Sequence, residues 1–289
     1  MQLHTLQNKK QKIFMQKYSA DFSVLMSVYN KENPEYLRDS LMSVFNQTLT
    51  AKEVILIKDG PVTDELNSVI CQFEKKHKEL HVIPFEKNRG LGKCLNDGIK
   101  LCSYDIIARM DTDDIAKPER FEEEYNYLAH HPECDIVGSW IEEFISTKDN
   151  VIAERRVPQQ HKEIYEYAKR RCPVNHPTVM YRKNAVMAVG GYLEQYFPED
   201  YFLWIRMLMN GSQFYNINKS LLWFRYSPET IKRRGGWKYA KDEIIIQHNI
   251  YKLGFISLHV MIENIAIRFS TRILPYPIRK LIYKTIRKH

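Results

Sequence analysis

The sequence of 289 residues has few cysteines and no long hydrophobic run. Its five cysteines are scattered without a CxxC pair, which excludes a disulfide framework or a cysteine zinc site and indicates a reducing compartment. The first twenty residues lack the apolar core of a secretory signal, so we expect no export. Nowhere do about eighteen apolar residues follow one another, and we therefore expect no membrane span.

Glycine-rich nucleotide-binding loops are missing as well. The segment Asn88–Lys93 fits neither the P-loop nor the GxGxxG fingerprint, which argues against an ATPase and a dehydrogenase. A sugar-nucleotide nucleotidyltransferase would carry a Gly-rich loop after its first strand, where this chain reads Tyr29–Asn33 without glycine. That enzyme therefore stays only an alternative.

The positive charge is concentrated near one end of the chain. The net charge is +8, and residues 251–289 hold eight basic side chains and a single acidic one, Glu263. The rest of the chain is nearly neutral. This distribution argues against a nucleic-acid surface and for a local contact with an anionic partner.

The first half of the chain alternates short apolar runs with segments of helical periodicity. The runs predict four strands, at Phe22–Tyr29, Glu53–Lys58, His81–Phe85 and Asp105–Met110. Helices are expected between them, because apolar residues recur there every three or four positions. Such alternation predicts a parallel, doubly wound sheet that binds its ligands beyond the carboxyl ends of the strands.

The second half predicts a mixed extension of this sheet. Strands are expected at Ile136–Phe144, Thr178–Arg182, Gln213–Ile217 and Leu222–Tyr226, with helices at Lys162–Arg171 and Tyr201–Met209. From Gly236 onward the pattern is helical. The predicted fold class is therefore α/β, with a Rossmann-like sheet, a mixed extension and C-terminal helices. We divide the chain into a polar extension (1–20), a catalytic domain (21–235) and a basic helical region (236–289).

The run Asp111-Thr112-Asp113-Asp114 directly follows the fourth predicted strand. Neighbouring carboxylates repel one another unless a cation neutralises them, and hard oxygen ligands suit Mg²⁺ or Mn²⁺ shared with substrate phosphates. The alternative is structural, in which Asp114 caps a helix that begins near Pro118. We expect Asp113, with or without Asp111, to hold a divalent cation.

Glu199-Asp200 opens a predicted helix. Acids at a helix N-terminus are favoured by the helix dipole, which is the structural interpretation. A catalytic carboxylate fits the same place, since inverting sugar transfer needs one base to deprotonate the acceptor hydroxyl. We assign that role to Asp200 and place Glu199 near the acceptor or the diphosphate.

Three further polar residues are candidates with a strong structural alternative. Arg89 and Lys93 stand where a helix N-terminus would approach a diphosphate, although surface cations there are more often solvated. His176 stands before a proline, where a histidine is usually a turn or packing residue. If it is functional, it should contact the acceptor or the diphosphate.

As an ordered set, these residues resemble the family 2 glycosyltransferases of the GT-A fold. The matching segments, which span roughly Phe22 to Tyr226, are SVYNK (27–31), KDG (58–60), NRGLGKCLNDGI (88–99), ARMDTDD (108–114), NHPTVMYRK (175–183), GGY (190–192) and PEDYFLWIRM (198–207). The ordered combination is far more specific than any one motif.

The resemblance implies a role for each site residue. Tyr29 would lie against the uracil ring of a UDP-sugar, Asp59 would accept a hydrogen bond from uracil N3–H, and Arg89 would lie near the nucleotide. Asp111 would face the ribose and diphosphate, while Asp113 would hold the metal ion. Asp200 matches the base of the family.

The chain departs from the family pattern in two places. Many relatives have a histidine after the late strand, where this chain reads Arg225-Tyr226-Ser227, so water and phosphate would complete the metal shell. The QxxRW signature of processive synthases is also missing, which favours the addition of a single sugar. Arg233 and Arg234, which stand before two glycines, fit either a lid over the diphosphate or a basic interdomain turn.

Two amphipathic segments end the chain. Apolar residues of Leu258–Ile273 share one helical face, which we expect to pack on the catalytic domain. After Pro277, a short helix separates Ile278, Leu281, Ile282 and Ile286 from basic residues, as suits an anionic membrane surface.

A basic tail of this kind suits an enzyme of the cytoplasm that sits on the inner face of the bacterial cytoplasmic membrane. The resemblance then implies transfer of a hexose, with galactose or glucose favoured, to a lipid-diphosphate-linked O-antigen or capsule repeat unit. A non-catalytic, membrane-bound nucleotide or glycan binding protein is the other alternative.

Overall fold

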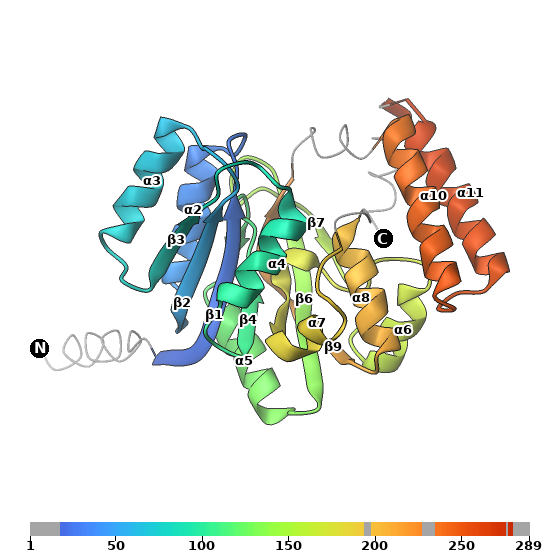
Figure 1. Cartoon of the computed structure of the whole chain (residues 1–289), viewed down its shortest axis with the longest axis horizontal. Helices are drawn as coiled ribbons and strands as arrows, with labels where there is room; N and C mark the ends of the chain where they lie inside the picture. The colour runs from blue at the N-terminus through green and yellow to red at the C-terminus, as the bar shows by residue number, and fades with distance from the viewer. Residues whose placement is uncertain (1–17, 194–197, 227–234, 276, 280–289) are drawn as a thin grey trace, which may run out of the picture.

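A computed structural model describes residues 18–193, 198–226, 235–275 and 277–279 (Figure 1). The elements of the first half are β1 (Tyr18–Val28), α2 (Pro34–Phe45), β2 (Leu49–Lys58), α3 (Asp64–Glu74), β3 (Leu80–Pro84), α4 (Leu91–Leu101) and β4 (Ile106–Arg109). Those of the middle are β5 (Ile115–Ala116), α5 (Arg120–His130), β6 (Cys134–Phe144), β7 (Val151–Arg155), α6 (His161–Ala168), η1 (His176–Thr178), β8 (Met180–Arg182), α7 (Lys183–Ala188), α8 (Glu199–Met209) and β9 (Gln213–Arg225). Two helices end the described part, α10 (Trp237–Lys252) and α11 (Leu258–Ile273).

The first half confirms the predicted parallel sheet. β1 lies between β2 and β4, β2 also pairs with β3, and all three pairings are parallel. The intervening helices form as the sequence indicates: the side chain of Asn33 caps α2, and Pro34 occupies its first turn. β1 begins at Tyr18, so the last residues of the expected N-terminal extension belong to the sheet.

The second half continues this sheet with mixed pairing, and the full order is β3-β2-β1-β4-β8-β6-β9-β5, with β7 on β6. β8 pairs antiparallel with β4 and β6, whereas β6 and β9 are parallel. The residues expected in two strands, 213–217 and 222–226, are extended up to Arg225, but the break expected between them is wrong, since β9 is continuous. The ladder shifts register between Ser139 and Trp140, and this bulge accommodates the exposed Asn218 and Lys219.

Helices cover both faces of the sheet (Figure 1). Leu37 and Leu41 of α2 pack with residues of α3 and α5 in the core on one face. On the other face, Leu95 of α4 and the fully buried Trp204 of α8 share a second core with Ile246 of α10. Because β1 to β4 run in one direction, their carboxyl ends open on a single edge of the molecule, from which α4 and α8 begin (Figure 1).

The helices α10 and α11 form an antiparallel pair at one side of the molecule (Figure 1). The expectation that α11 packs on the catalytic domain through its apolar face is confirmed only in part, because Met261 of that face packs on the second core. Leu258 and Ile262 remain 52% and 56% exposed, while the polar Asn264 is the buried residue of this helix. In the described residues, no helix combines the length and apolar character needed to cross a bilayer.

Candidate active site

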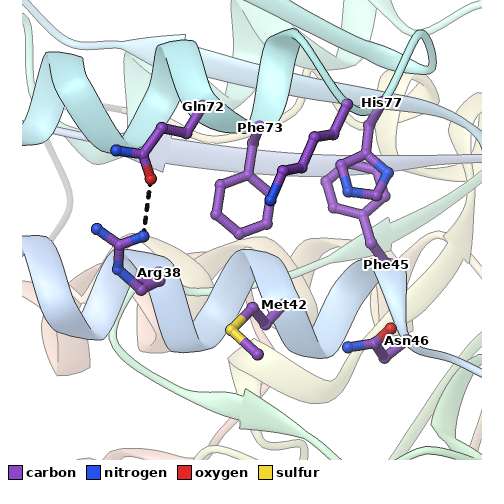
Figure 2. A pocket seen from close by; sticks show the side chains of 8 residues that line it. Arg38, Met42, Phe45, Asn46, Gln72, Phe73 and His77 are labelled. Atoms are coloured by element: carbon purple, nitrogen blue, oxygen red, sulfur yellow. Dashed lines mark hydrogen bonds between the residues drawn. The ribbon is translucent and has the colours of Figure 1, made fainter.

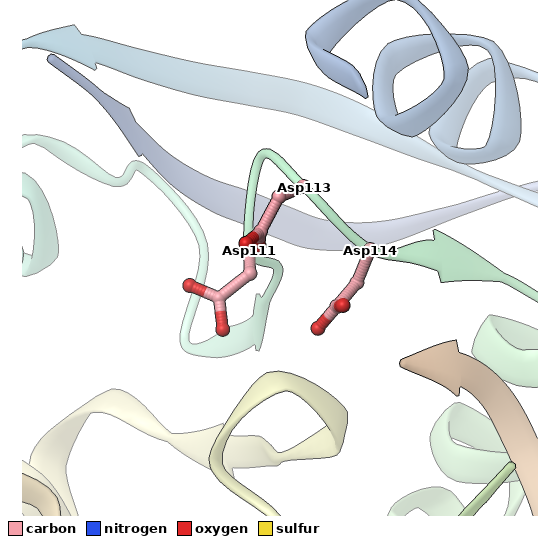
Figure 3. A group of neighbouring side chains, drawn as sticks. All are labelled: Asp111, Asp113 and Asp114. Carbon is pink, nitrogen blue, oxygen red and sulfur yellow. The ribbon is translucent and has the colours of Figure 1, made fainter. Parts of the chain in front are cut away.

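The acidic loop that follows β4 gathers three carboxylates. Asp111, Asp113 and Asp114 each bring one oxygen within 4.8 Å of the others (Figure 3). The loop is tied to its neighbours at two points: Ser40 Oγ donates to the backbone oxygen of Asp111 at 2.8 Å, and Thr112 Oγ1 donates to that of Ser27 at 3.2 Å. The carboxylates are therefore held at the carboxyl edge of the sheet.

Asp114 is fully buried within this group. Burial raises the pKa of its carboxyl well above the ordinary value, and the charges of Asp113 and Asp111 raise it further. One of its oxygens accepts the backbone N–H of Arg225 at 2.8 Å, and the other is buried without a hydrogen-bond partner in the described part of the chain. A divalent cation bound to these oxygens would neutralise the repulsion between the carboxylates and give the unpaired oxygen of Asp114 a partner. The donor set therefore fits Mg²⁺ or Mn²⁺. The helix-cap alternative for Asp114 is wrong, because α5 begins at Arg120 with Glu119 at its N-cap.

Two buried arginines position the acidic loop, and the sequence reasoning missed both. Arg109 is 1% exposed and forms an ion pair with Asp111. Burial alone would lower the pKa of Arg109, but the Asp111 carboxylate outweighs it and raises that pKa. Arg225 donates to the backbone oxygen of Asp113 at 2.9 Å and to Asp39 at 3.0 Å. A cation inside the otherwise apolar strand β4 was the available signal for Arg109.

The ends of β1 and β2 form the nucleotide side of the edge. Tyr29, half-buried, directly follows β1. Asp59 is buried at the end of β2, where its carboxylate accepts the backbone N–H groups of Arg89 at 2.7 Å and Gly90 at 3.0 Å. The thiol of Cys94 also hydrogen-bonds this carboxylate, and since a carboxylate has about four acceptor positions, one remains for a ligand. Gly60 is required beside it, because an added Cβ would lie 2.6 Å from the backbone nitrogen of Asn88.

Arg89 and Lys93, the two candidate cations on the nucleotide side, differ in their contacts. Arg89 pairs with Asp97 at 2.8 Å and lies over the ring of Phe85, 3.7 Å from its centroid. Lys93 lies half-buried in the first turn of α4. The structure thus brings Lys93 to the helix N-terminus, while it holds the guanidinium of Arg89 in an internal ion pair.

The start of α8 brings two more carboxylates to the same edge. Glu199 packs on the start of α4, since a Cβ added at Gly92 would lie 3.6 Å from its Cγ. Burial, and then the charge of Asp200, raises the pKa of Glu199 to about 7. Asp200 accepts a hydrogen bond from the thiol of Cys172, with Sγ and Oδ2 3.8 Å apart. Asp111 and Arg109 also act electrostatically on Glu199, which places α8 beside the acidic loop.

His176 belongs to a cluster with Tyr192 and Trp204. Its Nε2 lies 2.8 Å from the hydroxyl of Tyr192, and its ring centroid lies 6.0 Å from that of Trp204. Burial lowers the pKa of His176 well below its usual value, and the charge of Arg109 adds to this effect. The imidazole is therefore neutral near pH 7, so it can donate and accept hydrogen bonds without adding positive charge to the site.

Two features of the chain remain to be placed. Arg233 and Arg234 fall outside the described residues. A groove of about 210 Å³ lies between α2 and α3, on the opposite face from α4 and α8 (Figure 2). Its lining includes Phe45 stacked on His77, with ring centroids 3.8 Å apart, and contains no carboxylate. That groove cannot supply the metal ligands or the base that the acidic edge contains.

Comparison with known proteins shows the family of the chain. Residues 23–190 match the family described as glycosyl transferase family 2. The chain is 41% identical, over 92% of its length and 96% of the relative, to the UDP-Gal:alpha-D-GlcNAc-diphosphoundecaprenol beta-1,3-galactosyltransferase of Escherichia coli. It is 38% identical, over 92% of its length and 99% of the relative, to the amylovoran biosynthesis glycosyltransferase AmsE of Erwinia amylovora.

Among solved structures, the mannosyltransferase PcManGT from Pyrobaculum calidifontis, in complex with GDP-Man and Mn²⁺, has a similar fold. The TM-score is 0.60 at 13% sequence identity, and the match covers 86% of this chain and 71% of the other. At this identity the likeness concerns the fold, which is the GT-A arrangement that the sequence motifs implied.

Proposed function

This chain belongs to glycosyl transferase family 2, and we propose that it transfers a hexose, galactose or glucose, from a UDP-sugar to a hydroxyl of a lipid-diphosphate-linked glycan with inversion. The observation that carries the proposal is the meeting of the acidic loop with the carboxylates of α8 at one sheet edge. The name of the Escherichia coli relative supports both the donor and the acceptor class.

A divalent cation, Mn²⁺ or Mg²⁺, would be held by Asp113 and Asp111, beside the buried Asp114. When bound, the ion supplies positive charge that neutralises the diphosphate as its bond to the sugar breaks. Support comes from the shared geometry of the three carboxylates and from the Mn²⁺ in the structure of PcManGT. Arg109 and Arg225 keep the loop in place, since each binds one member of the loop.

Asp200 is the proposed general base. Inversion needs one carboxylate to take the proton of the acceptor hydroxyl while that oxygen attacks the anomeric carbon opposite the leaving diphosphate. Glu199 is the competing carboxylate, because a pKa of about 7 is favourable for a base. Its packing against the start of α4 and its interaction with Asp111 favour a contact with the diphosphate or the acceptor instead.

The acceptor places the enzyme at a membrane. We infer a position on the inner face of the bacterial cytoplasmic membrane, reached through the basic tail, most of which lies outside the described residues. Lys280, Lys284, Arg287 and Lys288 provide four cations without an acid between residues 280 and 289. Such a tail is attracted to the anionic lipids of a cytoplasmic leaflet.

Transfer assays test the proposal. The purified chain with Mn²⁺ is offered UDP-galactose, UDP-glucose and UDP-N-acetylglucosamine, together with a synthetic acceptor that carries GlcNAc-diphosphate on a short lipid. We expect transfer from a UDP-hexose. Failure with every donor and with a matching GalNAc acceptor would contradict the proposed function.

The Asp200→Ala variant separates catalysis from binding. We expect it to lose turnover while it still binds UDP with Mn²⁺ in calorimetry, and the Glu199→Gln variant to keep measurable turnover. A variant at Asp200 that transfers as fast as the wild type would move the base to Glu199. A wild-type protein that binds UDP-sugars without turnover would be the non-catalytic binding protein.

A further inference from the structure

The helix α11 is attached to the rest of the molecule through polar side chains and, near its start, through the partly buried Val260 and Met261. Asn264 Nδ2 donates to the backbone oxygen of Lys169 at 2.9 Å and to Gln247 at 2.8 Å. Arg268 and Arg272 both bind the buried Glu243 of α10, at 2.7 and 2.9 Å. These residues recur every four positions, so the side of α11 that faces inward is its polar stripe.

Several apolar residues of α11 are left on the outside. Of the 17 large hydrophobic side chains that are exposed in the described residues, nine lie between Trp237 and Ile278. We call the outer stripe the set of Trp237 from α10 and Leu258, Ile262, Phe269 and Ile273 from α11, of which Phe269 is half-buried and the others are exposed. Trp237 is 68% exposed, and its ring meets that of Phe269 edge to face with centroids 5.6 Å apart. A contiguous apolar surface of this kind marks a contact with a partner or a membrane.

The charges around the outer stripe are those of a surface that meets anions. Lys238, Lys241 and Lys252 of α10 are exposed. Two of the acids in the pair are already neutralised: Glu243 by the two arginines, and Glu263 by Arg170 at 2.7 Å and His259 at 3.0 Å. The sequence after residue 279 adds four more cations and no acid. Apolar side chains flanked by cations are typical of helices that lie in the interface of an anionic bilayer.

The position of the pair adds a second argument. α10 begins and α11 ends at the edge of the molecule where β1 to β4 point and where α4 and α8 begin (Figure 1). Gly236, just before Trp237, donates its backbone N–H to the backbone oxygen of Arg272 at 2.9 Å, which joins these two helix ends. The aromatic end of the outer stripe is therefore on the same side as the acidic loop.

We propose that the outer stripe is a bilayer-binding surface, with Trp237 and Ile273 at the end nearest the active-site edge. It acts together with the basic tail: the cations attract the protein to anionic lipid, and the stripe enters the headgroup region. The physiological use of this surface rests on the proposed lipid-linked acceptor, because a soluble acceptor would not require it. Lipid contact itself can be measured without any substrate.

Trp237 provides the direct probe, since its side chain is the exposed one among the four tryptophans. Vesicles of phosphatidylethanolamine and phosphatidylglycerol that contain a brominated lipid quench tryptophans that reach the acyl boundary. We expect quenching of wild-type fluorescence and its loss in Trp237→Phe, a variant that keeps the ring contact with Phe269. Equal quenching in both proteins, or none in the wild type, would overturn the proposal.

A flotation assay with the same vesicles tests the aliphatic part. Replacing two exposed isoleucines in Ile262→Ser/Ile273→Ser removes apolar area, so we expect the partition coefficient to fall about tenfold or more. The matched control is Val151→Ser/Ile152→Ser in β7, at 44% and 43% exposure, which should float like the wild type. Equal flotation of the two double variants would overturn the proposal.

Two further readouts separate lipid contact from self-association and from a catalytic defect. A wild-type dimer in light scattering that becomes a monomer only in Ile262→Ser/Ile273→Ser would overturn the proposal, because a second copy would then cover the stripe.

Transfer to a short, water-soluble acceptor should be unchanged in every variant of the stripe. Loss of vesicle binding with that transfer intact supports the surface, whereas absent transfer in the wild type contradicts the proposed function and leaves the lipid measurement standing.

Discussion

The catalytic body and the helix α11 differ in the kind of side chain that they bury most deeply. The body places fully buried apolar residues such as Leu25 and Trp204 between its sheet and its helices. The pair attaches α11 through Asn264, Arg268 and Arg272, and it leaves Ile262 and Ile273 exposed. Apolar burial holds the body together and includes Ile246 and Ile250 of α10, whereas the outer face of α11 leaves apolar side chains exposed.

This difference indicates that the two regions serve separate functions, catalysis and attachment. Chemistry depends on polar groups that the body fixes by internal bonds, such as the ion pair between Arg109 and Asp111. Attachment to a membrane depends on apolar and basic groups that the helix pair keeps outside. Changes in one region should therefore leave the function of the other intact.

The largest effect is expected in the body. Asp113→Ala removes one of three clustered carboxylates, so the charge of the diphosphate is poorly neutralised and turnover should fall about 1,000-fold or more. Calorimetry of UDP with Mn²⁺ should show that metal-dependent binding is lost, while vesicle flotation is unchanged. Metal-dependent affinity equal to that of the wild type would remove Asp113 from the metal site.

In the helix pair, Glu243→Ala should have the largest effect. It leaves Arg268 and Arg272 without their buried partner, and breaking a buried ion pair typically lowers the free energy of unfolding by about 3–5 kcal/mol. Urea denaturation measures the loss, and amide exchange should locate it in α10 and α11. Glu263→Ala is the control, because that ion pair is exposed and its loss should leave the stability nearly unchanged.

The basic tail should be removable without harm to the body. Deleting residues 280–289 removes four cations, each worth about 1 kcal/mol of attraction to a charged bilayer, or roughly 4 kcal/mol together. The cut follows Arg279 because that side chain is buried beside Gly235. Flotation should weaken and lose most of its salt dependence, since the outer stripe is not screened by salt. Transfer to a soluble acceptor that falls with the deletion would place the tail in the active site.

A smaller effect is expected at Asp59. The variant Asp59→Ala should weaken UDP binding by about 1.5–3 kcal/mol, the usual contribution of a hydrogen bond to a charged group. The structure adds a second consequence, because the same carboxylate holds the backbone of Arg89 and Gly90, so the melting temperature should also fall. Asp59→Asn keeps an acceptor for one of these groups and should lose less stability. UDP affinity equal to that of the wild type in Asp59→Ala would leave Asp59 a structural role alone.

The last prediction concerns the dependence of stability on pH. Burial and the charge of Asp200 raise the pKa of Glu199 to about 7, so its carboxyl favours the folded state when protonated and loses that advantage as the pH rises through 7. Glu199→Gln should therefore gain stability relative to the wild type between about pH 5 and about pH 8. Thermal melts across this range measure the difference, which should vanish near pH 4. A constant difference across the range would show that Glu199 does not titrate there.

The sequence predicted the body better than the helix pair, for a physical reason. Each strand from β1 to β4 is an apolar run that can only be buried, so the sheet and the loop after β4 followed directly. In α11, periodicity shows which residues share a face, but it does not show which face turns inward. The choice was decided by Glu243, a residue of another helix that binds both arginines.

Prediction of the candidate site from the sequence was limited in the same way. The acidic loop and the start of α8 were recognisable as local motifs, and the structure brings them to one edge. Arg109 and Arg225 act on that loop from β4 and from β9, and Arg225 is 112 residues away from its Asp113 partner in sequence. A contact over such a distance depends on the order of strands in the sheet, which no local pattern contains.

The stereochemistry of the product tests the central claim most directly. The enzyme is incubated with Mn²⁺, a UDP-α-hexose that it accepts and a soluble GlcNAc-diphosphate acceptor, and the anomeric proton coupling of the new linkage is measured by NMR before any rearrangement. A single base acting opposite the leaving group predicts a β linkage. An α linkage would show retention and would contradict the assignment of Asp200 as the base of an inverting transfer.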